Sequence, residues 1–124
     1  MWELAQLYLR EDQICEAFDA LLQAQKLERR NGEVALTLGM LALDLDDEKT
    51  AGRALRSVTA MKDRTGASLA AQGARPSERS KAYFLLGNMA RKKGDTSAAR
   101  RLAHKAVAED PDNRDAQLLL EVLQ

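Results

Sequence analysis

The hydrophobic positions of the chain recur at fixed intervals. A large apolar residue followed by a small one stands at Leu4-Ala5, Leu38-Gly39 and Leu86-Gly87. Three more columns keep the same two intervals along the chain: Ala17, Ala51 and Ala99; Leu21, Leu55 and Ala103; and Ala24, Val58 and Ala106. Self-similarity at a fixed period is typical of repeat architectures. The pattern therefore predicts three copies of one repeat, with an insertion that lengthens the interval between the second and third copies.

Each copy has the hydrophobic spacing of two helices. In both halves of a copy the apolar residues step by three and four positions, which places their side chains on one stripe of a helix. Aspartates stand where the second helix of each copy is expected to begin, the position at which a side-chain oxygen caps a helix. They are Asp12, Asp46 or Asp47, and Asp95.

These patterns predict one all-α domain of about seven helices. We expect repeats at residues 1–31, 32–65 and 80–113, an insertion at 66–79 and a terminal helix at 114–124. The small residues Ala5, Gly39 and Gly87 occupy one column of the repeat. A helix residue without a bulky side chain lets a second helix approach closely, so we expect a helix contact at this column.

The composition excludes several classes of protein. Among 124 residues, 19 are basic and 19 acidic, so no net charge draws the whole chain to nucleic acid or to an anionic membrane. A single cysteine, Cys15, and a single histidine, His104, exclude a disulfide framework and argue against a zinc site. The longest nearly apolar stretch, Val34 to Leu43, is about half the length that spans a bilayer. The default expectation is a reducing compartment, the cytoplasm, but the localisation stays unknown, because an upstream signal could have been removed.

The chain carries little material for catalysis. The acidic run from Asp44 to Glu48 is not a calcium loop, because an EF-hand would need glycine at Lys49 and glutamate at Leu55. His104 and Cys15 have no partner at ligand or catalytic spacing, and no phosphate-binding glycine loop occurs. We therefore expect no enzyme, no metal site and no cofactor.

A helix pair that repeats with a period of about 34 residues and has these columns resembles the tetratricopeptide repeat. The third copy, Ser80 to Asn113, carries most of the signature: Tyr83, Leu86-Gly87, Ala90, Gly94-Asp95, Ala99, Ala106 and Asp110-Pro111. The resemblance covers nearly the whole chain outside the insertion, although the first two copies are degenerate. It implies a right-handed α-solenoid of about three and a half repeats and a non-catalytic role in protein–protein interaction, as an adaptor, scaffold or assembly factor.

In tetratricopeptide arrays the first helix of each repeat lines a concave wall. The residues that match this wall lie off the core stripe and step by four and three; they are Trp2, Gln6, Leu9, Leu36, Met40, Leu43, Phe84, Asn88 and Arg91, followed by Leu118 and Val122. Lys92 follows on the same side. Most are apolar, which suits a helix or an extended peptide of a protein partner. Two other interpretations stay open. These side chains can pack internally, or the chain can be a fragment of a longer array whose ends, including Leu118 to Leu120, mediate self-association.

One known use of such modules is excluded. Modules that hold the terminal carboxylate of chaperone tails carry lysine, asparagine and arginine on this wall. The matching positions of the first two repeats hold Trp2, Gln6 and Met40. Lys81 and Phe84 stand near the matching positions of the third repeat.

Charge is unevenly distributed along the chain. Residues 11–48 carry a net charge of −7, residues 49–105 carry +11 and residues 106–124 carry −4. Such patches favour head-to-tail contact or a charged partner, unless they form only a solvated face. The basic residues lack interleaved aromatic residues, which argues against a nucleic-acid role.

Overall fold

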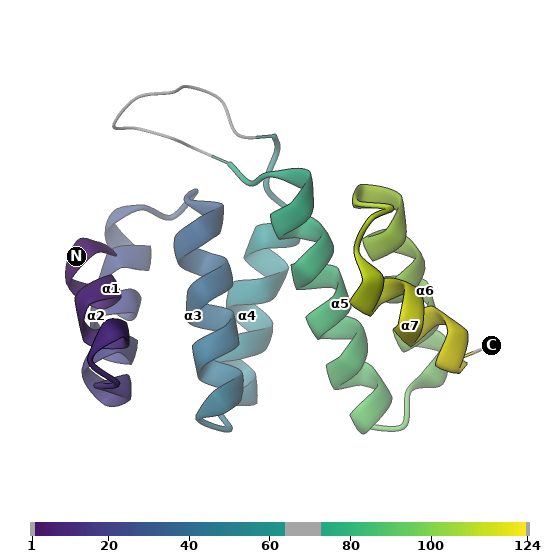
Figure 1. Ribbon diagram of the computed structural model, residues 1–124, viewed down its shortest axis with the longest axis horizontal. Helices are drawn as coiled ribbons and strands as arrows, with labels where there is room; N and C mark the ends of the chain where they lie inside the picture. Colours follow the sequence, from purple (N-terminus) through teal and green to yellow (C-terminus); the bar gives the residue numbers. More distant parts are fainter. Residues whose placement is uncertain (1, 64–72, 124) are drawn as a thin grey trace.

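The computed structural model describes residues 2–63 and 73–123, and these residues form seven α-helices with no strand beyond isolated bridges. The helices are α1 (Trp2–Arg10), α2 (Ile14–Leu27), α3 (Gly32–Asp44), α4 (Glu48–Thr59), α5 (Pro76–Lys92), α6 (Thr96–Glu109) and α7 (Arg114–Leu123). Each helix packs against the next, and α5 also packs against α3 and α7. Figure 1 shows α1, α3, α5 and α7 in the nearer layer and α2, α4 and α6 behind them. The predicted all-α repeat solenoid is confirmed.

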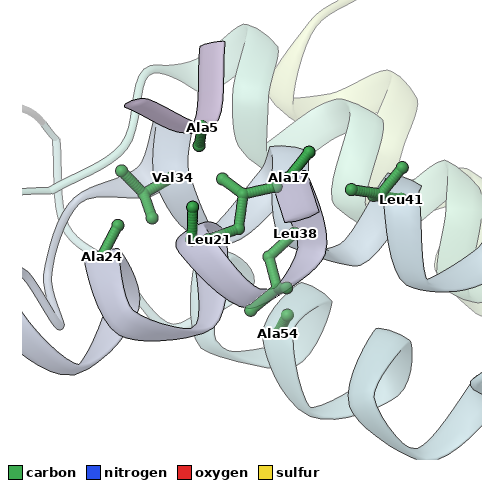
Figure 2. Close-up of a cluster of buried hydrophobic side chains, with 9 residues drawn as sticks. Ala5, Ala17, Leu21, Ala24, Val34, Leu38, Leu41 and Ala54 are labelled. Carbon is green, nitrogen blue, oxygen red and sulfur yellow. The ribbon is translucent and has the colours of Figure 1, made fainter. Parts of the chain in front are cut away.

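The core consists of three clusters that follow one another along the stack. The first joins α1 to α4 and is drawn in Figure 2, where Leu21 and Leu38 lie among small side chains of the neighbouring helices. The second joins α3, α4 and α5 around Leu55 and Val58, and the third joins α5, α6 and α7 around Leu119. Because each cluster shares helices with the next, the stack is stabilised by contacts between neighbours, as in other solenoids.

The column of small residues marks the closest contacts within the helix pairs. A Cβ atom added to Gly39 would lie 2.7 Å from Cδ2 of Leu55, closer than such atoms ever approach. A Cβ atom on Gly87 would lie 3.3 Å from the carbonyl oxygen of Ala99 and from Cβ of Leu102. The close approach predicted from the sequence is confirmed for both glycines.

The turns within the helix pairs repeat the same backbone conformation. Asp12, Asp46 and Gly94 all have a left-handed φ, of 57°, 60° and 85°. These three positions are separated by the same two intervals as the hydrophobic columns. The third copy uses glycine, which adopts this conformation without a steric penalty, whereas the first two use aspartate, which tolerates it less well.

The residue after each left-handed position stands where the following helix is capped. Asp95 accepts a hydrogen bond from the backbone N–H of Ala98 (3.1 Å), so this predicted cap is confirmed. Of the two candidates in the second copy, Asp47 is the cap, because it accepts a hydrogen bond from the backbone N–H of Thr50 (3.2 Å). The prediction for Asp12 was wrong, because α2 is preceded by Gln13, whose side chain makes no capping bond. Sequence spacing alone could not separate the turn residue from the cap beside it.

A single guanidinium joins the two ends of the insertion to the helix stack. Arg79, in the first turns of α5, donates to Asp63 (2.5 Å), to the carbonyl oxygens of Met61 (3.3 Å) and Ala74 (3.1 Å), and to Glu109. Burial opposes its charged form, but the hydrogen bonds to Glu109 and Asp63 outweigh that effect and raise the pKa of Arg79. Residues 66–72, the first half of the predicted insertion, lie outside the described residues, and its last four residues belong to α5.

A buried serine holds the third helix pair and α7 together. The Ser80 hydroxyl is fully buried; it donates to the carbonyl oxygen of Ala106 (2.7 Å) and accepts from the Asn113 amide (2.9 Å). Asn113 in turn accepts from the backbone N–H of Ala116 in α7 (3.2 Å). The hydroxyl of Ser80 thus has both a donor and an acceptor partner, which offsets the cost of burying it.

Gly39→Ala should lower the free energy of unfolding by about 1–3 kcal/mol, because the added Cβ atom would press on Leu55, which is fully buried in the core. The better helix propensity of alanine offsets about 0.5–1 kcal/mol of this loss. Gly87→Ala, whose nearest contacts are at 3.3 Å, is the matched control and should lose less. Urea denaturation of both variants measures the difference, and a Gly39→Ala variant as stable as the parent would contradict the close contact.

Gly94→Ala should lower the free energy of unfolding by about 1–2 kcal/mol, the usual cost of a left-handed residue with a Cβ atom. The cost is purely conformational, because no neighbouring atom lies within 4 Å of the added Cβ. Asp46→Gly should instead raise the free energy of unfolding, since glycine relieves the same backbone strain in the second copy. Thermal unfolding measures both variants. If both shifted the unfolding temperature in the same direction, backbone strain would be ruled out as the cause.

Acid should remove the contribution of Asp47 to stability. Hydrogen bonds from the side chain and the backbone N–H of Thr50 lower the pKa of Asp47 in the folded state. A lowered pKa stabilises the fold above the unfolded-state value of about 3.9, and this contribution disappears as the pH falls through the folded-state value. Asp47→Asn keeps a capping oxygen but no charge. The parent should therefore be the more stable protein at about pH 6, and the difference between the two free energies of unfolding should shrink as the pH is lowered from about 4.

Candidate binding surface

The ten side chains expected on the wall lie on three helices of the nearer layer. Trp2, Gln6 and Leu9 are on α1, Leu36, Met40 and Leu43 are on α3, and Phe84, Asn88, Arg91 and Lys92 are on α5. Helices α3 and α5 pack directly against each other, whereas α1 is joined to them mainly through α2, which packs against both α1 and α3. The residues on α3 and α5 are therefore brought together more closely than those on α1.

Most of the apolar members of this set contribute to the core. Leu36 is only 8% exposed, and Leu43 is half-buried in the same cluster. Trp2 and Leu9 are half-buried against the first cluster, and Phe84 against the third. Internal packing, the alternative left open by the sequence, thus accounts for a large part of these side chains.

Met40 differs from the other apolar residues of the set. It stands between Leu36 and Leu43 on one stripe of α3, and both of these leucines pack in the cluster that includes Leu85 and Met89 of α5. Met40 itself is 46% exposed. We call the surface of Met40, Asn88, Arg91 and Lys92, with the accessible parts of Leu43 and Phe84, the α3–α5 surface.

The terminal helix of the described chain also exposes apolar side chains. Leu118 and Val122 of α7 are 58% and 66% exposed, whereas Leu119 and Leu123 on its other face are buried. One face of α7 thus packs on the third cluster, and the other is exposed within the described part of the chain.

Two adjoining cavities lie on the other layer, where the sequence predicted no site. A cavity of about 480 Å³ is lined by Leu22, Gln25, Lys26, Arg29, Arg53 and Ser57. A second, of about 580 Å³, is lined by Arg29, Arg30, Ser57, Ala60, Met61, Lys62, Asp63 and Gly73. Because Arg29 and Ser57 line both, we treat the two cavities as one α2–α4 groove.

The net charges of the chain segments did not predict this basic groove. Lys26, Arg29 and Arg30 are the three basic residues of the segment 11–48, whose net charge is −7. All three line the α2–α4 groove, together with Arg53 and Lys62 from the following basic segment. The net charge of the segment 11–48 includes acids that do not line the groove. The basic residues could therefore be recognised as one group only by knowing that α2 and α4 lie next to the same cavities.

Residues 2–63 and 73–123 contain no cluster of histidine, cysteine, aspartate and glutamate that could hold a metal ion. No described helix combines the length and the apolar character that crossing a membrane requires.

Residues 80–113 match the family model of the tetratricopeptide repeat. The fold of the chain is similar to that in the crystal structure of MamA, with a TM-score of 0.74 and 18% sequence identity. The similarity covers 97% of this chain and 62% of the MamA chain, so this chain spans less than two thirds of that protein's length. No curated protein sequence matches the chain.

The helix pair α5–α6 therefore matches the tetratricopeptide repeat, and the described chain has the fold of a repeat solenoid. The resemblance predicted from the sequence is confirmed, as is the helical solenoid that it implied. Tetratricopeptide repeats generally mediate protein–protein interaction and are typically non-catalytic.

Proposed function

We propose that the protein is a non-catalytic adaptor or assembly factor that binds a helix or an extended peptide of a partner protein on the α3–α5 surface. The observation that carries the proposal is the exposure of Met40 between two leucines that pack toward α5. Methionine is adaptable and is common at surfaces that bind varied apolar partners. A partner that covers Met40 would extend the core cluster of α3 and α5 outward.

The charged residues beside Met40 favour an amphipathic partner. Arg91 and Lys92 are exposed in the last turn of α5, and Asn88 is half-buried one turn earlier. Because the leucines are already largely buried, apolar contact alone offers little more than one side chain, about 1.5–3 kcal/mol. Association costs about 4–15 kcal/mol, so polar contacts to Arg91, Lys92 and Asn88 have to supply most of the binding free energy.

A second candidate function rests on α7. Leu118 and Val122 form an exposed apolar face on a helix whose opposite face is in the core. Solenoids grow by stacking such faces, so a second copy of the chain can cover α7. This mode requires no foreign partner, and its concentration dependence separates it from binding at the α3–α5 surface.

Met40→Glu should weaken capture of a protein partner by at least about tenfold, because a carboxylate would have to be buried against apolar residues. Leu27→Glu is the matched control: it makes the same kind of change at a residue that is 73% exposed on the other layer. Partners captured by the immobilised parent protein supply the ligand, and circular dichroism verifies the fold of both variants. Equal capture by parent and Met40→Glu would place the binding surface elsewhere.

Val122→Glu should abolish self-association if α7 mediates it, since charge repulsion and desolvation would then oppose the contact. Sedimentation velocity over a range of concentrations gives the oligomeric state. A parent protein that stays monomeric throughout would exclude this second candidate.

A further inference from the structure

The α2–α4 groove concentrates positive charge. Five basic residues line it: Lys26, Arg29, Arg30, Arg53 and Lys62. The only acid in the described lining, Asp63, is already held by Arg79 at 2.5 Å. All five basic residues are exposed, and within residues 2–63 and 73–123 none of them forms a salt bridge.

Local helix electrostatics do not explain this number of charges. The groove lies at the C-terminal ends of α2 and α4, which end at Leu27 and Thr59. Basic residues are favourable there, because each helix end carries about half a negative charge. Two helix ends therefore balance about one of the five cations. The carboxylate of Asp47 attracts Arg53 at longer range but is occupied with capping α4 through Thr50.

The lining indicates which anion would fit. Arg29 and Arg53 come from different elements, one from the segment after α2 and one from α4, and a guanidinium binds a carboxylate through two parallel hydrogen bonds. Leu22 and Met61 add apolar surface to the lining. No aromatic residue lines either cavity in the described part of the chain, so the stacking that holds single-stranded nucleic acid is missing.

We propose that the α2–α4 groove is a second docking site, and that its occupant is an acidic peptide segment of a partner protein. Aspartate or glutamate side chains pair with Arg29 and Arg53, and a neighbouring apolar side chain rests on Leu22 or Met61. The groove belongs to the layer of α2 and α4, whereas the α3–α5 surface belongs to the other layer. One protein molecule can therefore hold two different partners at once, which suits an assembly factor.

The test uses a short fluorescein-labelled peptide rich in glutamate with one central leucine, and the same peptide with glutamine in place of glutamate. Fluorescence anisotropy should show binding of the acidic peptide, weakened by added salt, and much weaker binding of the glutamine peptide. Arg29→Glu and Arg53→Glu should each weaken binding by at least about tenfold, the usual scale for losing a charged hydrogen-bonded contact.

Arg101→Glu is the matched control, because it changes the net charge of the chain by the same amount at an exposed position on α6. It should bind the acidic peptide like the parent, and so should Met40→Glu, which separates this site from the α3–α5 surface. If Arg101→Glu and Arg29→Glu lost equal affinity for the acidic peptide, the proposal would be overturned, since the attraction would then depend only on the net charge of the chain. Tighter binding of a single-stranded oligonucleotide than of the peptide, or no peptide binding at about 1 mM, would also overturn it.

Discussion

Close contact between the two helices of a pair is the constraint on which the solenoid depends. In the second pair the backbone of Gly39 lies against Leu55 with no room for a Cβ atom. Leu55 also belongs to the cluster that includes Ala82 of α5. The distance between α3 and α4 therefore affects where α5, the first helix of the next pair, packs. Glycine costs a helix about 0.5–1 kcal/mol relative to alanine, and the contact of a fully buried leucine offsets that cost.

The break in the repeat between α4 and α5 is spanned by polar contacts. Arg79 connects the segment after α4, the segment before α5 and the end of α6 through Asp63, Ala74 and Glu109. Ser80, the next residue, performs the same function for α5, α6 and the start of α7. Where the regular spacing of small residues is interrupted, hydrogen bonds with defined geometry help to fix the relative position of the helices.

The two layers of the solenoid differ in chemistry. Between α3 and α5 of the nearer layer, an exposed methionine lies among partly buried apolar residues. Between α2 and α4 of the other layer, basic side chains accompany a small apolar surface. A single row of helix pairs exposes both sides along its whole length, so a small repeat protein can carry two unlike surfaces without enlarging its core.

The sequence by itself determined the features that are local to one repeat. The period of the repeat, the helix pairs, the contact at Gly39 and the cap Asp95 all follow from residues close together in the chain, whereas the second cap stayed open between Asp46 and Asp47. The left-handed turn at Asp12 was mistaken for a cap, because adjacent positions of one turn look alike without backbone angles. The wall residues were selected by helical phase, which cannot tell that Leu36 is buried whereas Met40 is exposed.

Only the tertiary structure decided which residues of different repeats become neighbours. Arg29 and Arg53 come from different repeats and from segments of opposite net charge, yet they line one cavity because α2 and α4 occupy the same layer. Helical phase and composition describe one helix at a time. The placement of the second helices of successive pairs depends on the distance and angle of stacking, and these are set by core side chains from all the helices involved.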